Sequence, residues 1–118
     1  MTTLAEVFDS LKYRVDVDRH GTRMYYNSAG QLHREDGPAV VWCDGDLEWF
    51  HNGKRYRIGG PAVIWRSGSN EWWQNGQRHR IDGPAVEYAD GCKEWWVDDV
   101  NYTEQEYYTQ LKVLGFKT

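Results

Sequence analysis

The chain has 118 residues, of which 14 are Lys or Arg and 18 are Asp or Glu, so its net charge at neutral pH is −4. This acidic surplus disfavours a general nucleic-acid-binding protein, for which a basic surface is expected. The hydrophobic fraction of 40% is modest, but it includes 7 Trp and 8 Tyr. We therefore expect one domain, residues 1–118, with a largely aromatic core.

The N-terminal segment has apolar residues at helical spacing, namely Leu4, Val7, Phe8 and Leu11. The pattern predicts a short helix over residues 1–14. This segment lacks the charged start and apolar centre of a signal peptide, and no apolar run approaches the roughly 20 residues of a membrane span. We therefore expect a cytoplasmic protein without a membrane span.

A single ten-residue sequence motif, which we call the clause, occurs three times in the middle of the chain, as HREDGPAVVW, YRIGGPAVIW and HRIDGPAVEY. Its Gly-Pro step starts at Gly37, Gly60 and Gly83, at a strict interval of 23 residues. The same interval relates four aromatic residues and four turn residues: Tyr26, Trp49, Trp72 and Trp95; Gly30, Gly53, Gly76 and Asp99. A fixed period of this length predicts a repeat architecture over residues 15–101, with three copies and a degenerate copy at each end.

Each unit contains the signals of a β-hairpin. The Pro opens a run of β-favouring residues that stops at a tight turn such as Asp44-Gly45. A second strand over residues 47–51 ends at another turn, Asn52-Gly53, and a wider loop leads to the next unit. The predicted fold is mainly β, an elongated antiparallel meander of about seven or eight strands with short helices at both ends. Because side chains alternate along a strand, Trp72 and Trp73 should lie on opposite faces, which makes both faces aromatic.

The C-terminal segment, residues 102–118, predicts a second helix. Thr103 and Glu106 have the spacing of a capping box, and Gly115 is suited to end the helix. Tyr107, Tyr108, Leu111 and Leu114 form its apolar stripe. We expect both helices to cap the sheet, although a free docking helix is the alternative.

The cysteines and histidines do not predict a shared site. Cys43 and Cys92 lie about two units apart, which corresponds to roughly 19 Å across stacked strands and predicts free thiols. His33 and His79 have the same separation, which excludes a common metal ion. His20 and His51 are single, and no serine recurs with a base. The sequence therefore predicts no metal, no cofactor and no catalysis.

One Arg recurs after the histidine position of each clause, at Arg34, Arg57 and Arg80. In one interpretation each guanidinium holds its own loop, for example through Asp36 or Asp82. In the other, the three form a basic ladder along one edge, reinforced by Lys54, Arg55 and Arg78, that meets an acidic partner.

One Glu recurs within the second strand of each unit, at Glu48, Glu71 and Glu94. These carboxylates are either solvated groups that keep one face soluble, or they combine with aromatic neighbours to form a partner-binding surface. The aromatic neighbours on that face are Phe50, Trp73 and Trp96.

The period of 23 residues and the stretch WWQNGQRH resemble the MORN repeat, the membrane occupation and recognition nexus. The resemblance covers roughly residues 23–101, and the recurring Glu and Arg positions depart from it. The whole clause is similar to a MORN-like variant in small proteins of bacteriophages, large DNA viruses and some bacteria. This resemblance implies an elongated hairpin sheet and a phage or bacterial origin, with no implied reaction.

The resulting hypothesis is a non-catalytic protein-binding module, an accessory phage protein that binds and inhibits a bacterial host or defence protein in the host cytoplasm. The alternative is a sheet that binds a nucleotide signal or a sugar, and membrane-lipid association is disfavoured by the acidic charge. A homodimer through an open sheet edge is a further possibility. The candidate partner-binding residues are Arg34, Arg55, Arg57, Arg78, Arg80, Glu71, Glu94, Trp73 and Trp96.

Overall fold

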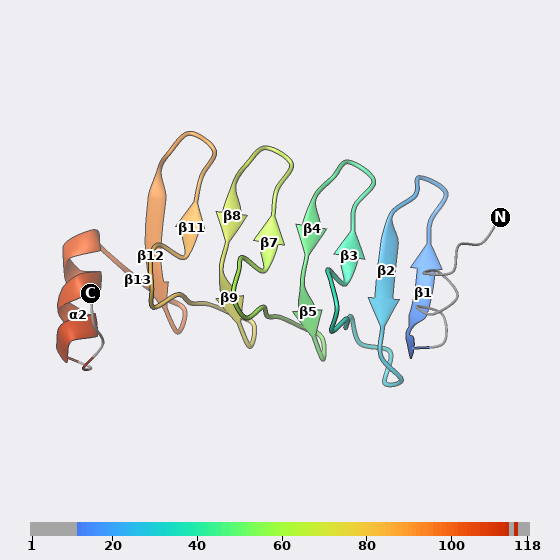
Figure 1. Cartoon of the computed structure of the whole chain (residues 1–118), viewed down its shortest axis with the longest axis horizontal. Coiled ribbons are helices and arrows are strands. Elements are labelled where there is room, and N and C mark those ends of the chain that lie inside the picture. Colours follow the sequence, from blue (N-terminus) through green and yellow to red (C-terminus); the bar gives the residue numbers. More distant parts are fainter. Residues whose placement is uncertain (1–11, 114, 116–118) are drawn as a thin grey trace.

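A computed structural model describes residues 12–113 and residue 115. This part of the chain forms an antiparallel nine-stranded meander with one short helix at its C-terminal end (Figure 1). Its extents are 53 × 30 × 20 Å and its radius of gyration is 16.5 Å, whereas a compact domain of this length has a radius of about 13–14 Å. The predicted elongated β fold is confirmed.

The strands follow chain order across the main sheet, with the strand labels of Figure 1. They are β1 (Arg14–Val17), β2 (Arg23–Tyr26), β3 (Val40–Val41), β4 (Leu47–Glu48), β7 (Val63–Ile64), β8 (Asn70–Glu71), β11 (Val86–Glu87), β12 (Lys93–Val97) and β13 (Val100–Tyr102). Two smaller hairpins extend the lower half of the sheet. They are β5 (Phe50–His51) with β6 (Lys54–Arg55), and β9 (Trp73–Gln74) with β10 (Gln77–Arg78).

The predicted turns close these hairpins. Gly45 has a φ of 105° between β3 and β4, a backbone conformation that a Cβ would strain. Asn52 and Gly53 both have positive φ, 48° and 82°, as a two-residue type I′ turn requires. Because such a turn matches the twist of the flanking strands, the register of each unit follows from its own sequence.

The first, degenerate copy is out of step with the others by one residue. Tyr25, not Tyr26, occupies the position of Trp49, since its backbone N–H donates to Ala39 O as that of Trp49 donates to Ala62 O. The prediction that placed Tyr26 in this set is therefore wrong. The cause is a longer lower turn, residues 27–31, in which Asn27 caps the loop with its side-chain oxygen.

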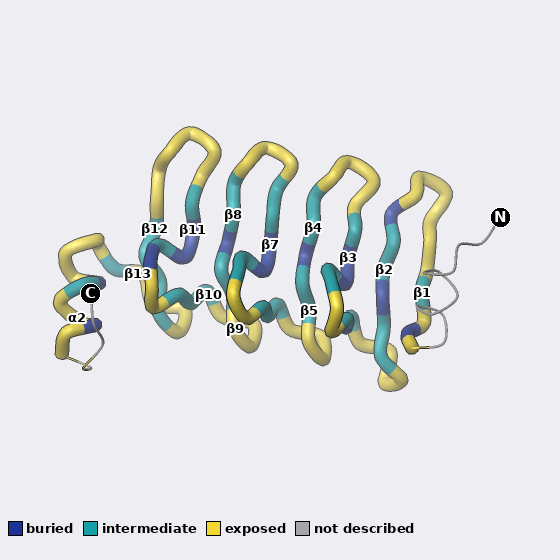
Figure 2. The backbone as a smooth tube through the Cα atoms, viewed as in Figure 1, coloured by how far each residue is buried: buried dark blue, intermediate teal, exposed yellow. Residues whose placement is uncertain are grey.

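The core is a repeated pair of small apolar residues rather than a central cluster. The Ala and Val that follow each Pro have exposed fractions of 0–2%. They are Ala39, Val40, Ala62, Val63, Ala85 and Val86. Figure 2 shows this buried band running across the middle of the sheet, with exposed turns above and below. Since each pair is covered by adjacent units, a single hairpin would leave it open to water.

The wide loop of each unit is held by its Arg. The Arg57 guanidinium lies 3.9 Å from the centre of the Trp49 ring, and its Nη1 donates to Pro61 O at 3.0 Å. On the other side of the guanidinium lies Gly60, where a Cβ would stand 3.0 Å from Arg57 Cζ. The guanidinium is thus enclosed between an indole ring and a glycine.

The same arrangement recurs at Arg34 on Tyr25, at 4.0 Å, and at Arg80 on Trp72, at 3.8 Å. We call it the arginine clamp. It explains why the clause repeats Arg, Gly and Pro together, because the three residues supply the cation, the space and the acceptor.

The helix α2 (Glu104–Val113) closes the C-terminal end of the sheet. Its predicted capping box is confirmed, since Thr103 N donates to Glu106 Oε1 at 2.9 Å and Glu106 N donates to Thr103 Oγ1 at 3.1 Å. Tyr107 and Leu111 are buried against the sheet, so α2 acts as a cap. Most of the predicted helix over residues 1–14, and Leu114, lie outside the described residues. The predicted boundary at residue 14 is wrong, because Arg14 is the first residue of the strand β1.

Two further predictions can be compared with the structure. Cys43 and Cys92 are free and exposed, as expected from their separation. The described part of the chain contains no helix with the length and hydropathy that crossing a bilayer requires.

The clamp predicts a coupled effect of Gly60 and Arg57. Gly60 has no positive φ, so Gly60→Ala alone would normally be neutral or slightly stabilising. Because the new methyl would press on Arg57, we expect a destabilisation of about 1–3 kcal/mol. In an Arg57→Met background the cost should largely disappear. Urea unfolding of the two single variants and the double variant measures this coupling, and additive effects would contradict the clamp.

Candidate functional site

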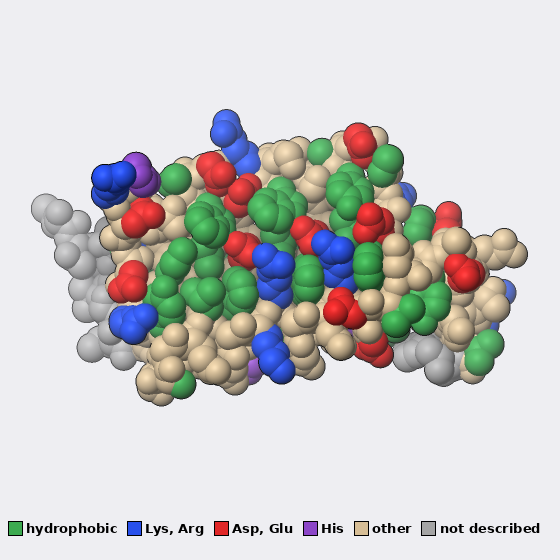
Figure 3. Space-filling model, turned by 180° about the vertical axis from the view of Figure 1, so that it is seen from behind, with side chains coloured by type: hydrophobic (Ala, Val, Ile, Leu, Met, Phe, Trp, Pro, Cys, Tyr) green, Lys and Arg blue, Asp and Glu red, His purple; other side chains and the backbone are tan. Residues whose placement is uncertain are grey.

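One broad face of the sheet carries aromatic, acidic and basic side chains in rows, and we call it the Trp–Glu face. Figure 3 shows hydrophobic side chains gathered in rows across this face, with acidic and basic side chains between them. The upper aromatic row contains Trp42, Trp65 and Tyr88, and the middle row contains Glu48, Glu71 and Glu94. The lower part contains Phe50, Trp73 and Trp96 with Arg55 and Arg78.

Each carboxylate of the middle row accepts a hydrogen bond from the aromatic residue above it, and Glu71 and Glu94 also accept one from the indole below. Glu71 accepts from Trp65 Nε1 at 2.6 Å and from Trp73 Nε1 at 3.1 Å, and Arg78 Nη2 lies 3.4 Å away. Glu48 accepts from Trp42 Nε1 at 2.6 Å and from Arg55 Nη2 at 2.8 Å. The carboxylates therefore fix the orientation of the rings around them.

The expectation that these carboxylates are solvated is wrong for two of the three. Glu48 is 6% exposed and Glu71 is 8% exposed, since they pair in register with Val40 and Val63 in the centre of the sheet. Burying a carboxylate costs several kcal/mol unless hydrogen bonds replace its water. The indole and guanidinium donors supply that replacement, so the Glu belongs with its Trp and Arg neighbours. The predicted grouping of Glu71 with Trp73 and of Glu94 with Trp96 is confirmed.

Glu94 differs from the other two because Asn101 stands where Arg78 stands one unit earlier. Within residues 12–113, Glu94 has no ion-pair partner, and it accepts from Tyr88 Oη at 2.8 Å and Trp96 Nε1 at 2.9 Å. The hydrogen bond to this carboxylate, with a smaller effect of burial, raises the pKa of Tyr88. The C-terminal end of the Trp–Glu face is therefore its acidic end.

The five candidate arginines do not form one ladder, which corrects that prediction. Arg55 and Arg78 belong to the Trp–Glu face, where Arg78 lies 5.2 Å from the Trp73 ring and 5.1 Å from the Trp96 ring. Arg57 and its counterparts cover the opposite face, which we call the loop face. The cause is local, because the chain leaves the strand after Arg55 and turns back over Trp49.

The loop-clamp interpretation of Arg34, Arg57 and Arg80 agrees with their contacts. Arg34 Nε donates to Asp36 Oδ1 at 3.2 Å. Arg80 reaches Asp82 at 2.9 Å and Glu87 at 3.0 Å, and it donates to Pro84 O at 3.0 Å. Arg57 has no carboxylate partner in the described chain, and its burial lowers the pKa of its guanidinium.

The structure brings together two histidines that the sequence presents as separate. The rings of His33 and His51 lie 4.7 Å apart, and the Tyr56 ring follows at 5.5 Å from His51. The two residues are 18 positions apart and lie in different units of the repeat, on opposite sides of a hairpin, so only the fold shows that they meet. His33 Nδ1 accepts a hydrogen bond from Asn52 N at 2.9 Å. This imidazole therefore has a structural role, because it holds the turn between β5 and β6. Among the described residues, no group of three His, Cys, Asp or Glu side chains could hold a metal ion.

The chemistry of the Trp–Glu face is that of a binding surface. Trp42 and Tyr88 remain 37% and 41% exposed, although their polar atoms are already bound to Glu48 and Glu94. What they offer to solvent is mainly apolar ring area, held in place by buried carboxylates. No protein-family model, no curated protein and no solved structure matches the chain.

The clamps predict unequal effects of removing their arginines. Arg80→Met removes two carboxylate contacts, one carbonyl contact and the stacking on Trp72, whereas Arg57→Met removes only the carbonyl contact and the stacking. We expect Arg80→Met to lower the free energy of unfolding by about 1–3 kcal/mol, and by about 0.5–1 kcal/mol more than Arg57→Met. Chemical denaturation measures both, and an equal or larger cost for Arg57→Met would contradict this assignment.

The Tyr88–Glu94 contact predicts an alkaline pH dependence. Because the folded pKa of Tyr88 is raised, the contact stabilises the fold below the ordinary tyrosine pKa of about 10 and is lost as the pH rises through the folded value. NMR titration of the labelled Tyr88 ring should give a midpoint above 10, and Glu94→Gln should bring it back towards 10. An unchanged midpoint in the variant would show that Glu94 is not the cause.

Proposed function

We propose that the protein is a non-catalytic protein-binding module and that its Trp–Glu face is the binding surface. The observation that carries this proposal is the fixed array around Glu71, in which two tryptophans and one arginine are held by the same buried carboxylate. Trp, Tyr and Arg are the residue types that dominate the binding energy of protein interfaces. No catalytic step is proposed.

Pre-ordering supports binding on this face. A protein interface loses affinity when mobile side chains must be immobilised on association, at roughly 0.5–1.5 kcal/mol each. Here the Trp73 ring is already held by Glu71 and flanked by Arg55 and Arg78. The molecule measures 53 by 30 Å in its two longer directions, which leaves room for the roughly 800 Å² per partner of a standard interface.

The expected partner chemistry follows from the two ends of the face. Arg55 and Arg78 lie among the aromatic rings of the middle units, whereas Glu94 at the C-terminal end has no basic partner in the described chain. A partner with an apolar patch and a basic residue near one end complements this arrangement. The alternative of a nucleotide or sugar ligand has less support, because the carboxylates and most indole N–H groups of this face already bind one another.

The biological role of the proposed module comes from the resemblance of its repeats alone. On that basis the protein is an accessory phage protein that binds and inhibits a bacterial host or defence protein in the host cytoplasm. A homodimer through an open sheet edge is less favoured. The edge strand β1 carries exposed, charged Arg14 and Asp16, and charges of this kind discourage edge-to-edge pairing.

Affinity capture from bacterial lysate, followed by mass spectrometry, tests the module and its surface together. We expect the wild-type chain to retain a specific protein, and Trp73→Ala with Trp96→Ala to weaken its binding at least about 30-fold, as for interface hot spots. The matched control is Val17→Ser, which changes a side chain that is 55% exposed on the edge strand β1.

The melting temperature of each variant is measured alongside binding, so that lost binding is not confused with lost folding. Undiminished binding of the partner by the folded Trp73→Ala/Trp96→Ala variant would show that the interface is not the Trp–Glu face. Failure of the wild-type chain to retain any specific protein would count against the module itself.

A further inference from the structure

The loop face contains two hollows that repeat with the period of the sequence. The first has a volume of about 630 Å³ and is lined by Arg34, Gly37, Trp49, Tyr56, Arg57 and Ile58. The second has a volume of about 490 Å³ and is lined by the residues one period later, Arg57, Gly60, Trp72, His79, Arg80 and Ile81. Both lie between consecutive wide loops, so they are properties of the repeat and not of one loop.

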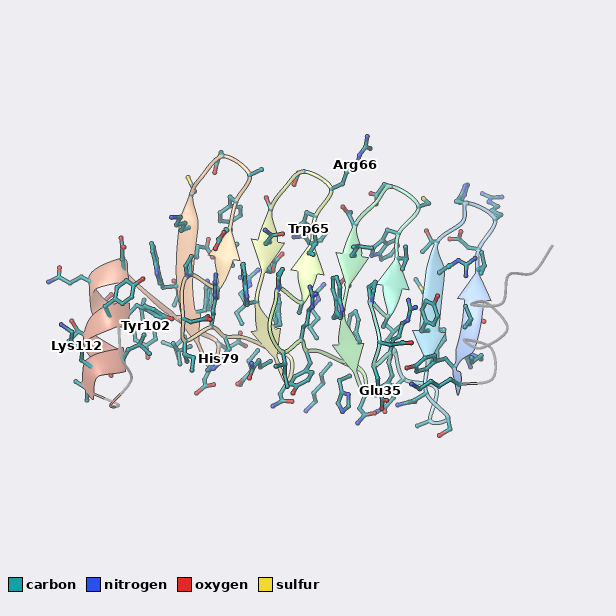
Figure 4. All side chains as sticks on the ribbon, in the orientation of Figure 1. Glu35, Trp65, Arg66, His79, Tyr102 and Lys112 are labelled. Atoms are coloured by element: carbon teal, nitrogen blue, oxygen red, sulfur yellow. The ribbon has the colours of Figure 1, made fainter. Side chains whose placement is uncertain are left out.

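The next hollow in the series is filled by the chain itself. One period beyond the second hollow, the equivalent positions are Arg80, Gly83, Trp95 and Tyr102, and Figure 4 shows Tyr102 lying beside α2. Here Tyr107 of α2 is fully buried. Its hydroxyl donates to Arg80 O at 2.6 Å and accepts from Gly83 N at 3.3 Å.

The opposite end of the series also holds a tyrosine. Tyr13 is 6% exposed and packs edge-on against Tyr25, with ring centres 5.9 Å apart. Its hydroxyl accepts from Glu35 N at 2.9 Å and lies 3.4 Å from Asp36 Oδ1. Tyr25 and His33 stand where Trp49 and Tyr56 line the first open hollow. At both ends of the repeat array, therefore, a tyrosine of the chain itself, Tyr13 or Tyr107, occupies the place of the hollow.

The second open hollow keeps the polar groups that Tyr107 uses in the third. Arg57 O and Gly60 N correspond to Arg80 O and Gly83 N, and no hydrogen bond of the described chain engages them. Around them lie the apolar walls of Trp72 and the 40% exposed Ile81. An acceptor and a donor a few ångströms apart, beside an apolar wall, match one phenol group.

We infer that the two open hollows bind tyrosine side chains presented by a partner protein, in the manner of Tyr107. This site lies on the loop face and is separate from the Trp–Glu face, so it goes beyond the proposed function. Consecutive hollows are two strands apart, or roughly 10 Å. A partner segment with two tyrosines at this spacing fits both, for example a helix with tyrosines seven residues apart, at a rise of about 1.5 Å per residue.

The first experiment uses the intact protein and p-cresol, the side-chain analogue of tyrosine, with toluene as the matched probe that lacks the hydroxyl. NMR follows the indole N–H of Trp49 and Trp72 and the amide of Gly60. We expect saturable shifts with half-saturation on the order of millimolar for p-cresol, and binding of toluene at least about tenfold weaker. The amide of Gly83, already bonded to Tyr107, should not respond.

Two single variants, one in each hollow, serve as controls for each other. Ile81→Ser should abolish the shifts at Trp72 and leave those at Trp49, and Ile58→Ser should do the reverse, since each isoleucine lines one hollow and is exposed. Equal binding of toluene, an equal response at Gly83, or shifts confined to Trp73 and Trp96 would overturn the inference, as would no shift at all.

A second experiment distinguishes a protein tyrosine from a free phenol. An alanine-based helical peptide with two tyrosines seven residues apart should bind at least about tenfold more tightly than p-cresol, because the second contact becomes intramolecular. Its counterpart with both tyrosines replaced by phenylalanine should lose this gain. Binding of p-cresol without tighter binding of the peptide would assign the hollows to a free phenolic molecule and refute a tyrosine-bearing partner.

Discussion

The stacking of an arginine between an aromatic ring and a glycine is the contact on which the rest of the structure depends. It fixes the wide loop of each unit on the strand before it, as Arg57 does between Trp49 and Gly60. With the loop in place, the Ala and Val after each Pro become buried, and the next strand starts in register. The same local arrangement therefore positions successive units along the thin sheet.

The period, the turns and the C-terminal cap could be predicted from the sequence because each depends on neighbouring residues. The turn at Asn52-Gly53 and the capping box of Thr103 and Glu106 involve only residues that are close in sequence. Their residue types alone therefore predict them. The one-residue shift at Tyr25 could not be predicted, because an extra residue in a turn is invisible until hydrogen bonds show which carbonyl each N–H meets.

The face of each charged residue was harder to predict than the strands. Alternation holds while the chain is extended and fails once it leaves the strand, so Arg55 and Arg57 reach opposite faces despite an even spacing. The burial of Glu71 was missed for a different reason. Its indole and guanidinium donors come from adjacent strands, and polarity alone suggests solvent. The available signal was the recurrence, in every unit, of a Glu with an aromatic residue two positions later.

The two faces of the sheet differ in where their polar groups lie. The Trp–Glu face holds its carboxylates and most of its indole N–H groups in internal hydrogen bonds and leaves ring area exposed, whereas the loop face leaves the backbone groups Arg57 O and Gly60 N without hydrogen bonds in the described chain. A sheet only 20 Å thick in its shortest direction can thus carry two unlike surfaces. Because the side chains of both surfaces project from the same hydrogen-bonded strands, equivalent residues repeat at the same distance along each surface.

The docking of α2 on the last clamp has a consequence for how such a chain can change. The helix packs mainly against β12 and β13, and it is bonded through Arg80 O and Gly83 N, whose equivalents recur in the other units. Inserting or deleting one whole period would therefore leave the end seal intact and alter the array by roughly 10 Å. The length of the sheet can therefore change by whole repeats of 23 residues while the helical cap at its C-terminal end is kept.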